Sequence, residues 1–156
     1  MCVRLLIAVR YFMPADLNLE FSIQAWLEKA TEDDLACVSL IEHGRARPAS
    51  ACFHAQQMAE KYLKALLAAS ELKVKKTHDL RVLATLLKDV FPEVLSFEIE
   101  FTILNKYAIT SRYPGDFPEG FTWADAQEAY DAAVKIKDFV MSKINVNSSG
   151  PSVKPS

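Results

Sequence analysis

The sequence has few residues that break helices and no apolar run long enough to cross a membrane. Only 4 of its 156 residues are glycine and 7 are proline, and several prolines stand where a helix would begin or end. A fold built from many short strands and turns is therefore disfavoured. The uninterrupted apolar stretch near the N-terminus, residues 5–9, is far below the ~20 residues of a membrane span.

Cysteine is scarce, and neither sign of charge dominates. The three cysteines, Cys2, Cys37 and Cys52, are an odd number without CxxC spacing, which argues against a disulfide framework and favours a reducing, cytoplasmic setting. Cys37 and Cys52 stand in apolar helical stretches, where we expect buried, inert thiols. The net charge of −2 gives no global attraction for nucleic acid, so any RNA contact has to be local.

Motifs for metal ions and phosphate loops are also missing. The three histidines, His43, His54 and His78, are scattered, and no two stand four residues apart on one helix. Glycine-rich phosphate loops and HExxH motifs are absent. We expect no metal site and no cofactor.

What the chain does have is a helical period over most of its length. Apolar residues make up 51% of the composition, enough for one core and one domain. They recur every three to four positions, which predicts an all-α, up-and-down bundle of about five helices with a long loop before the last. The predicted helices cover residues 22–41, 48–70, 79–90, 95–109 and 122–144.

The predicted domain is a bundle over residues 21–145. Residues 1–20 form an N-terminal extension, in which Met13 is the hypothetical true start, and residues 146–156 form a disordered tail. Because residues 95–109 are rich in β-branched and aromatic side chains, a pair of strands is an alternative there.

Three helix starts carry capping residues. Ser22 and Thr77 are predicted N-caps, and Thr122 with Asp125 forms a capping box before the last helix. In the first helix, Glu32, Asp33 and Asp34 form an acidic cluster, of which we expect at least two to be solvated.

The helix at residues 48–70 has polar groups on its apolar stripe. Gln56 and Glu60 lie within or beside the core-facing band, so they need partners. A satisfied hydrogen-bond network and a catalytic role are equally compatible with this pattern. The adjacent His54 is either a general base or a packed structural residue.

The loop at residues 110–121 and the connection at residues 71–78 are the other candidate sites. In the loop, Arg112 and Tyr113 could hold a phosphate and a base, or Arg112 could pair with Asp116 across the Pro-Gly turn. The connection and the helix after it carry a basic strip close to His78: Lys73, Lys75, Lys76 and Arg81. We expect Lys61 and Lys64 on the outer part of the second helix. Such lysines serve either solubility or attraction to a phosphate backbone.

Together these motifs resemble the HEPN domain family. The resemblance rests on FHAQQMAEKYLKALL (residues 53–67), KTHDL (76–80), RYP (112–114) and WADA (123–126), in order and spacing. It implies a helical bundle that usually forms a homodimer and is often encoded beside a minimal nucleotidyltransferase, as a toxin–antitoxin pair. Many members are metal-independent RNases, in which an Arg and a His four to six residues apart meet across the dimer interface.

This chain departs from the RNase pattern, because Phe117, Pro118 and Glu119 stand where that His would fall. His54 or His78 would have to replace it. The resemblance therefore implies RNA or nucleotide binding, and the branch with HAQQ and RYP is described mainly as nucleotide-binding. The catalytic candidates are Arg112 and His54, and the binding candidates are Arg112, Tyr113, Asp116, His78, Lys76 and Lys73.

Two further expectations concern partners. The alternative function, of another class, is a non-catalytic interaction module that docks on a nucleotidyltransferase and orients it. For the homodimer there is a physical correlate, since Trp26, Phe97, Phe101 and Tyr107 are more bulky groups than a slim bundle easily buries. Some of them are expected in an isologous patch.

Overall fold

The computed structural model describes residues 15–44, 47–110 and 120–148, and over these residues it contains helices and no strand. The elements are α2 (Ala15–His43), α3 (Pro48–Ala69), α4 (Leu80–Leu87), the 3-10 helix η1 (Pro92–Phe97), α5 (Glu98–Asn105), α6 (Tyr107–Thr110) and α7 (Trp123–Ser148). The all-α prediction is confirmed. In the part of the chain described, no helix is both long and apolar enough to cross a membrane.

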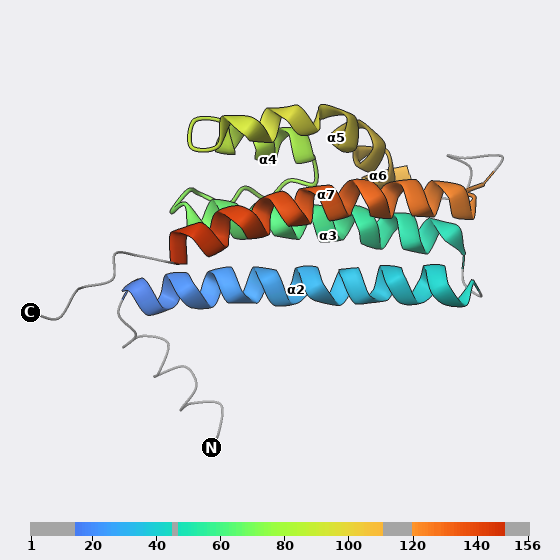
Figure 1. Cartoon of the computed structure of the whole chain (residues 1–156), viewed down its shortest axis with the longest axis horizontal. Helices are drawn as coiled ribbons and strands as arrows, with labels where there is room; N and C mark the ends of the chain where they lie inside the picture. Colours follow the sequence, from blue (N-terminus) through green and yellow to red (C-terminus); the bar gives the residue numbers. More distant parts are fainter. Residues whose placement is uncertain (1–14, 45–46, 111–119, 149–156) are drawn as a thin grey trace, which may run out of the picture.

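The helices form three layers (Figure 1). The long helix α2 lies along one side, α3 and α7 lie side by side in the middle, and α4, α5 and α6 cover the other side. The helix α3 runs opposite to α2, and α7 runs in the same direction as α3. This arrangement places α3 against nearly every other element.

Burial of α3 follows from its composition. Of its 22 residues, 14 are buried, and many of these are alanine, which lets neighbouring helices approach closely. Its three leucines, Leu63, Leu66 and Leu67, are fully buried, so each contributes the full gain of removing its side chain from water. The thiols of Cys37 on α2 and Cys52 on α3 are buried too, and burial raises the pKa of each to about 12. Both cysteines are inert members of the core, as predicted.

The predicted helix at residues 95–109 is divided into η1, α5 and α6. The pieces join at Glu98 and Lys106. Phe101 of α5 and Tyr107 of α6 lie in the core, each only 1% exposed. These two side chains are therefore not available for the expected isologous patch, which stays a prediction for Trp26 and Phe97. Phe97 is half-buried and packs against Phe139 of α7, with ring centroids 5.1 Å apart.

Two predicted caps differ in outcome. The capping box is present: Thr122 Oγ1 accepts from the Asp125 amide at 3.1 Å, and Asp125 Oδ2 accepts from the Thr122 amide at 2.8 Å. The Thr122 amide and hydroxyl both donate to the Asp125 carboxylate and hold its pKa below the ordinary value. For α4 the N-cap is Asp79 rather than Thr77, because the Asp79 carboxylate accepts from the Arg81 amide at 2.9 Å.

The end of α3 reverses the chain through a Schellman motif. The amide of Leu72 donates to Leu67 O at 2.9 Å, the amide of Glu71 donates to Ala68 O at 3.1 Å, and Glu71 has φ +56°. Residues 71–79 then run back along α3 towards α4 (Figure 1). We call residues 71–79 the basic segment.

Glu71 occupies a left-handed position that normally favours glycine, which yields a stability prediction. Replacing it (Glu71→Gly) removes the steric cost of a Cβ at positive φ, and the gain exceeds the extra entropy of glycine in the unfolded chain. We expect the free energy of unfolding to rise by about 0.5–1 kcal/mol, measured by urea denaturation. Lys73→Gly is the control, since Lys73 has no positive φ to relieve and should show no gain.

Candidate functional site

The carboxylate of Glu60 is the centre of a buried polar network on α3. It accepts from Lys64 Nζ at 2.7 Å, from Gln56 Nε2 at 3.1 Å and from Gln57 Nε2 at 3.4 Å. Gln57 Nε2 also donates to Gln56 Oε1 at 2.7 Å, and His78 Nδ1 lies 3.1 Å from Glu60 Oε2. The network that the polar residues on the apolar stripe indicated is confirmed.

Two charges are enclosed in this network. Glu60 is 3% exposed and Lys64 is 7% exposed, so each charge needs the other to offset its loss of hydration. Lys64 also lies over the ring of Trp26, 5.3 Å from its centroid. Placing Lys64 on the outer part of the helix was therefore wrong, because its ammonium finds a carboxylate one turn away and an aromatic face on α2.

The network reaches the basic segment through His78. Gln56 Nε2 donates to the backbone oxygen of His78 at 3.1 Å, while the His78 ring contacts Glu60. The amide of Leu80 donates to Asn105 Oδ1 at 3.0 Å, which ties the start of α4 to α5. The end of the basic segment is thus held from two sides, by α3 and by α5.

The lysines of the basic segment point away from the bundle. Leu72 and Val74 are half-buried against the core, whereas Lys73, Lys75 and Lys76 are exposed. Over residues 72–75 apolar and basic side chains alternate, and the bend at Lys76 places a second exposed lysine directly after Lys75. Within the described residues, no carboxylate forms an ion pair with any of these three lysines.

Arg81, the fourth member of the predicted strip, has a different environment. Its Nε donates to Glu98 Oε1 at 2.6 Å, and Nη2 donates to Thr102 Oγ1 at 2.7 Å. These contacts join α4 to α5. Among the residues that the structure describes, three of the four predicted cations are therefore exposed without an ion pair, and the fourth joins two helices.

His54 belongs to a second cluster, at the contact between α2 and α3. Its Nδ1 lies 2.8 Å from Asp33 Oδ1, and Lys61 of α3 pairs with the other oxygen of the same carboxylate. When Nδ1–H donates to the carboxylate, Nε2 of a neutral ring is left as a proton acceptor. The His54 side chain is 31% exposed, so solvent reaches the ring.

The neighbouring Asp34 makes equivalent contacts with α7. Tyr130 Oη donates to Asp34 at 3.0 Å, and Lys137 Nζ donates to it at 2.6 Å. Burial and the bond to Asp34 raise the pKa of Tyr130 to about 12. The expectation that at least two acidic residues of this cluster are solvated is wrong: only Glu32 is exposed, since Asp33 and Asp34 face α3 and α7.

The two clusters face different directions. Glu60 stands six positions after His54, and at 3.6 residues per turn their side chains lie roughly 120° apart around α3. The structure therefore does not join His54 and His78 in one site. Arg112, Tyr113 and Asp116 lie outside the described residues, so their predicted roles remain predictions.

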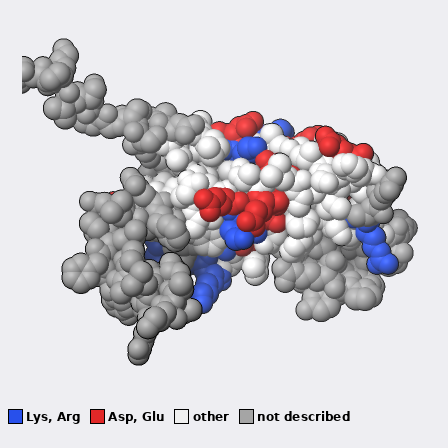
Figure 2. All heavy atoms as spheres, turned by 90° about the horizontal axis from the view of Figure 1, so that it is seen from below, with Lys and Arg blue, Asp and Glu red and all other residues white. Residues whose placement is uncertain are grey.

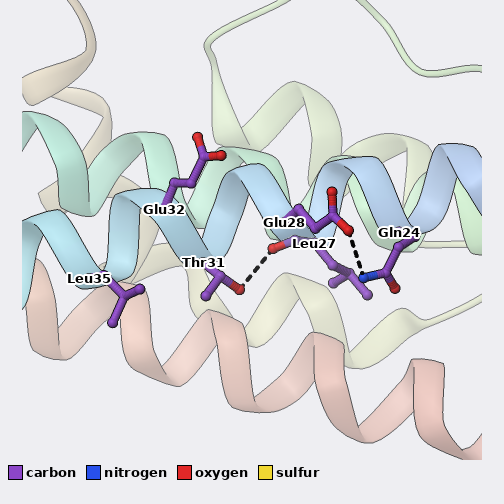
Figure 3. A pocket seen from close by; sticks show the side chains of 6 residues that line it. All are labelled: Gln24, Leu27, Glu28, Thr31, Glu32 and Leu35. Carbon is purple, nitrogen blue, oxygen red and sulfur yellow. Dashed lines mark hydrogen bonds between the residues drawn. The ribbon is translucent and has the colours of Figure 1, made fainter.

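The outward face of α2 carries a shallow hollow but no third site. Figure 2 views the molecule from the α2 side and shows acidic side chains gathered with basic ones beside them. On α2, Lys29 and Glu32 form an ion pair at 2.7 Å. The hollow is lined by side chains of α2 alone: Gln24, Leu27, Glu28, Thr31, Glu32 and Leu35 (Figure 3). Its polar groups already have partners within the helix. Over the described ranges, no group of three or more His, Cys, Asp or Glu side chains could hold a metal ion.

The geometry defines a helical bundle with an anchored basic segment, and comparison with known proteins identifies its family. The family model described as "HEPN domain" matches residues 23–144. The chain belongs to the HEPN family. No curated protein matches it.

Two solved structures are similar to this chain. The crystal structure of TT1696 from Thermus thermophilus is 34% identical with a TM-score of 0.65, and that of ST0689, an archaeal HEPN homologue, is 28% identical with a TM-score of 0.61. Each comparison covers 78% of this chain and 97% of the other.

The Asp33 cluster yields a prediction on pH. Burial by itself raises the pKa of the Asp33 carboxyl, but the hydrogen bonds and charges of His54 and Lys61 outweigh burial and hold the pKa below its ordinary value. A carboxyl with a lowered pKa stabilises the fold above about pH 4 and loses that contribution as the pH falls through the folded pKa.

We expect Asp33→Asn to lower the free energy of unfolding by about 1–3 kcal/mol at pH 7. It should also flatten the loss of stability between about pH 4 and pH 2, measured by urea denaturation at each pH. Glu32→Gln is the control, because Glu32 is exposed and pairs only with Lys29. An unchanged acid profile in Asp33→Asn would contradict the assignment.

Proposed function

We propose that this HEPN-family protein is the RNA- or nucleotide-binding component of a toxin–antitoxin-like pair, in which it acts as a homodimer with a nucleotidyltransferase partner. Membership of the HEPN family supports the general part of the proposal, that this is a HEPN-domain protein. The observation that carries the proposal for this chain is the basic segment, with its three exposed lysines on a backbone anchored to the buried network of α3.

Electrostatics favour an anionic ligand at this segment. The chain has a net charge of −2, so attraction to a polyanion cannot come from the molecule as a whole. Lys73, Lys75 and Lys76 stand close together in sequence with no carboxylate bound to them among the described residues. When lysines without an ion pair contact phosphates, the counterions bound to the nucleic acid are released into solution. This release drives binding that does not depend on the sequence of the nucleic acid.

The RYP motif would complete the site. By the resemblance, Arg112 holds a phosphate and Tyr113 stacks on a base or donates a hydrogen bond to it, with Asp116 beside them. Cleavage is a separate step. Without a His after Arg112, the Nε2 atom of His54 is the proposed acceptor of the 2′-hydroxyl proton, and Arg112 is the proposed stabiliser of phosphate charge. The 2′-oxygen bonds to phosphorus as the bond from phosphorus to the 5′-oxygen breaks, and the leaving 5′-oxygen takes a proton from solvent.

The first test removes positive charge from the basic segment. We expect Lys73→Ala/Lys76→Ala to weaken binding of a fluorescein-labelled single-stranded RNA in fluorescence anisotropy. If both lysines contact phosphates, the slope of log affinity against log salt should fall by about 1.4. Lys29→Ala is the matched control, since Lys29 is exposed on α2 and paired with Glu32. If the wild type, Lys73→Ala/Lys76→Ala and Lys29→Ala all show the same slope of log affinity against log salt, the proposal is contradicted.

The second test concerns the RYP loop. We expect Arg112→Ala to lower affinity for the same RNA and to relieve any growth inhibition caused by expression of the protein, because the bidentate contact with phosphate is lost. Arg112→Lys keeps the positive charge but loses the two parallel donors of the guanidinium group. We therefore expect it to keep only part of the wild-type affinity for RNA. Unchanged RNA binding and growth in Arg112→Ala, together with a stable nucleotidyltransferase complex, would favour the alternative function, a non-catalytic module that docks on and orients that enzyme.

A further inference from the structure

The basic segment is attached at its two ends by different means. At its start, the Schellman motif fixes Glu71 and Leu72 to the last turn of α3. At its end, Gln56 and Glu60 reach it through the backbone oxygen and the ring of His78. Between these ends, it is held by the packing of two apolar side chains, Leu72 and Val74.

The attachment at the end spans a long stretch of chain. Gln56 and His78 are 22 residues apart in sequence, and Gln56 stands 13 residues before the end of α3, about 20 Å along the helix axis. The basic segment covers this distance in reverse. Because Gln56 is fully buried, its amide has one fixed position from which it donates to His78.

The charges of the network are balanced within it. Glu60 pairs with Lys64, both of them buried, so the network fixes the basic segment without adding net charge to oppose a phosphate. We infer that Gln56 and Glu60 are positioning residues, which hold the lysines of the basic segment in place for a phosphate-bearing ligand that they do not touch. This inference rests on the proposed function for its ligand, but the anchoring itself can be measured without one.

The test uses two adjacent glutamines of the full-length protein. Gln56→Met keeps the buried volume and removes the donor to His78 O, whereas Gln57→Met removes an amide from the same network that does not contact the basic segment. Trypsin cleaves after exposed lysines once the backbone opens locally. We expect cleavage after Lys73, Lys75 and Lys76 to be about three- to tenfold faster in Gln56→Met than in Gln57→Met, at similar urea midpoints.

The RNA arm separates this inference from the proposed function. Gln56→Met should bind the labelled RNA at least about twofold more weakly than Gln57→Met, because only the anchored fraction is competent. Equal cleavage rates in the two variants overturn the anchoring. Faster cleavage with equal RNA affinity overturns the positioning role. A wild-type protein that binds no RNA overturns the proposed function alone, and the cleavage rates still decide the anchoring.

A surface variant covers the case in which Gln56→Met fails to fold. His78→Ala removes the ring contact with Glu60 from a side chain that is 59% exposed, so the core is left intact. We expect trypsin to cleave the basic segment faster in His78→Ala than in Gln57→Met. No rise in His78→Ala overturns the inference.

Discussion

The buried pairing of Glu60 with Lys64 is the constraint on which the rest of this bundle depends. Burying the Glu60 carboxylate alone, at 3% exposure, would cost more free energy than the packing of one helix against another provides. The buried pair is therefore stable only when all of its hydrogen-bonding groups have partners. Gln56, Gln57 and His78 complete it. In the described part of the chain, no buried side-chain nitrogen or oxygen lacks a partner. The satisfied network then specifies where the chain must run after α3, because one of its donors bonds to the backbone of the basic segment.

A second set of buried charges fixes the outer layer. Asp33 and Asp34 are adjacent on α2, so their side chains diverge by about 100° and face different neighbours. Asp33 binds His54 and Lys61 of α3, whereas Asp34 binds the α7 side chains. One dipeptide therefore contributes an ion pair to each of the two contacts of α2. The two clusters leave α3 with one polar face towards α2 and another towards the basic segment.

Much of the fold was readable from periodicity, and most of the errors share one cause. The long helices, the buried cysteines and the Thr122–Asp125 box depend on near neighbours in sequence, which spacing alone reports. The errors came at Asp33, Asp34 and Lys64, each of which looks solvated when its partner is unknown. The division of residues 95–109 into η1, α5 and α6 was not predicted, because such short helices leave weak periodic signals.

By itself, the sequence determined the helical class, the order of the long helices and the need for partners at Gln56 and Glu60, because a polar residue on an apolar stripe has to be satisfied wherever the chain folds. Only the tertiary structure decided which partners those are. It brought His78 to Glu60 and enclosed the Glu60–Lys64 pair against Trp26 of α2. Among the described residues it left Lys73, Lys75 and Lys76 without an ion pair, because these outcomes depend on the path of the chain around α3. Spacing along a sequence contains no information on that path.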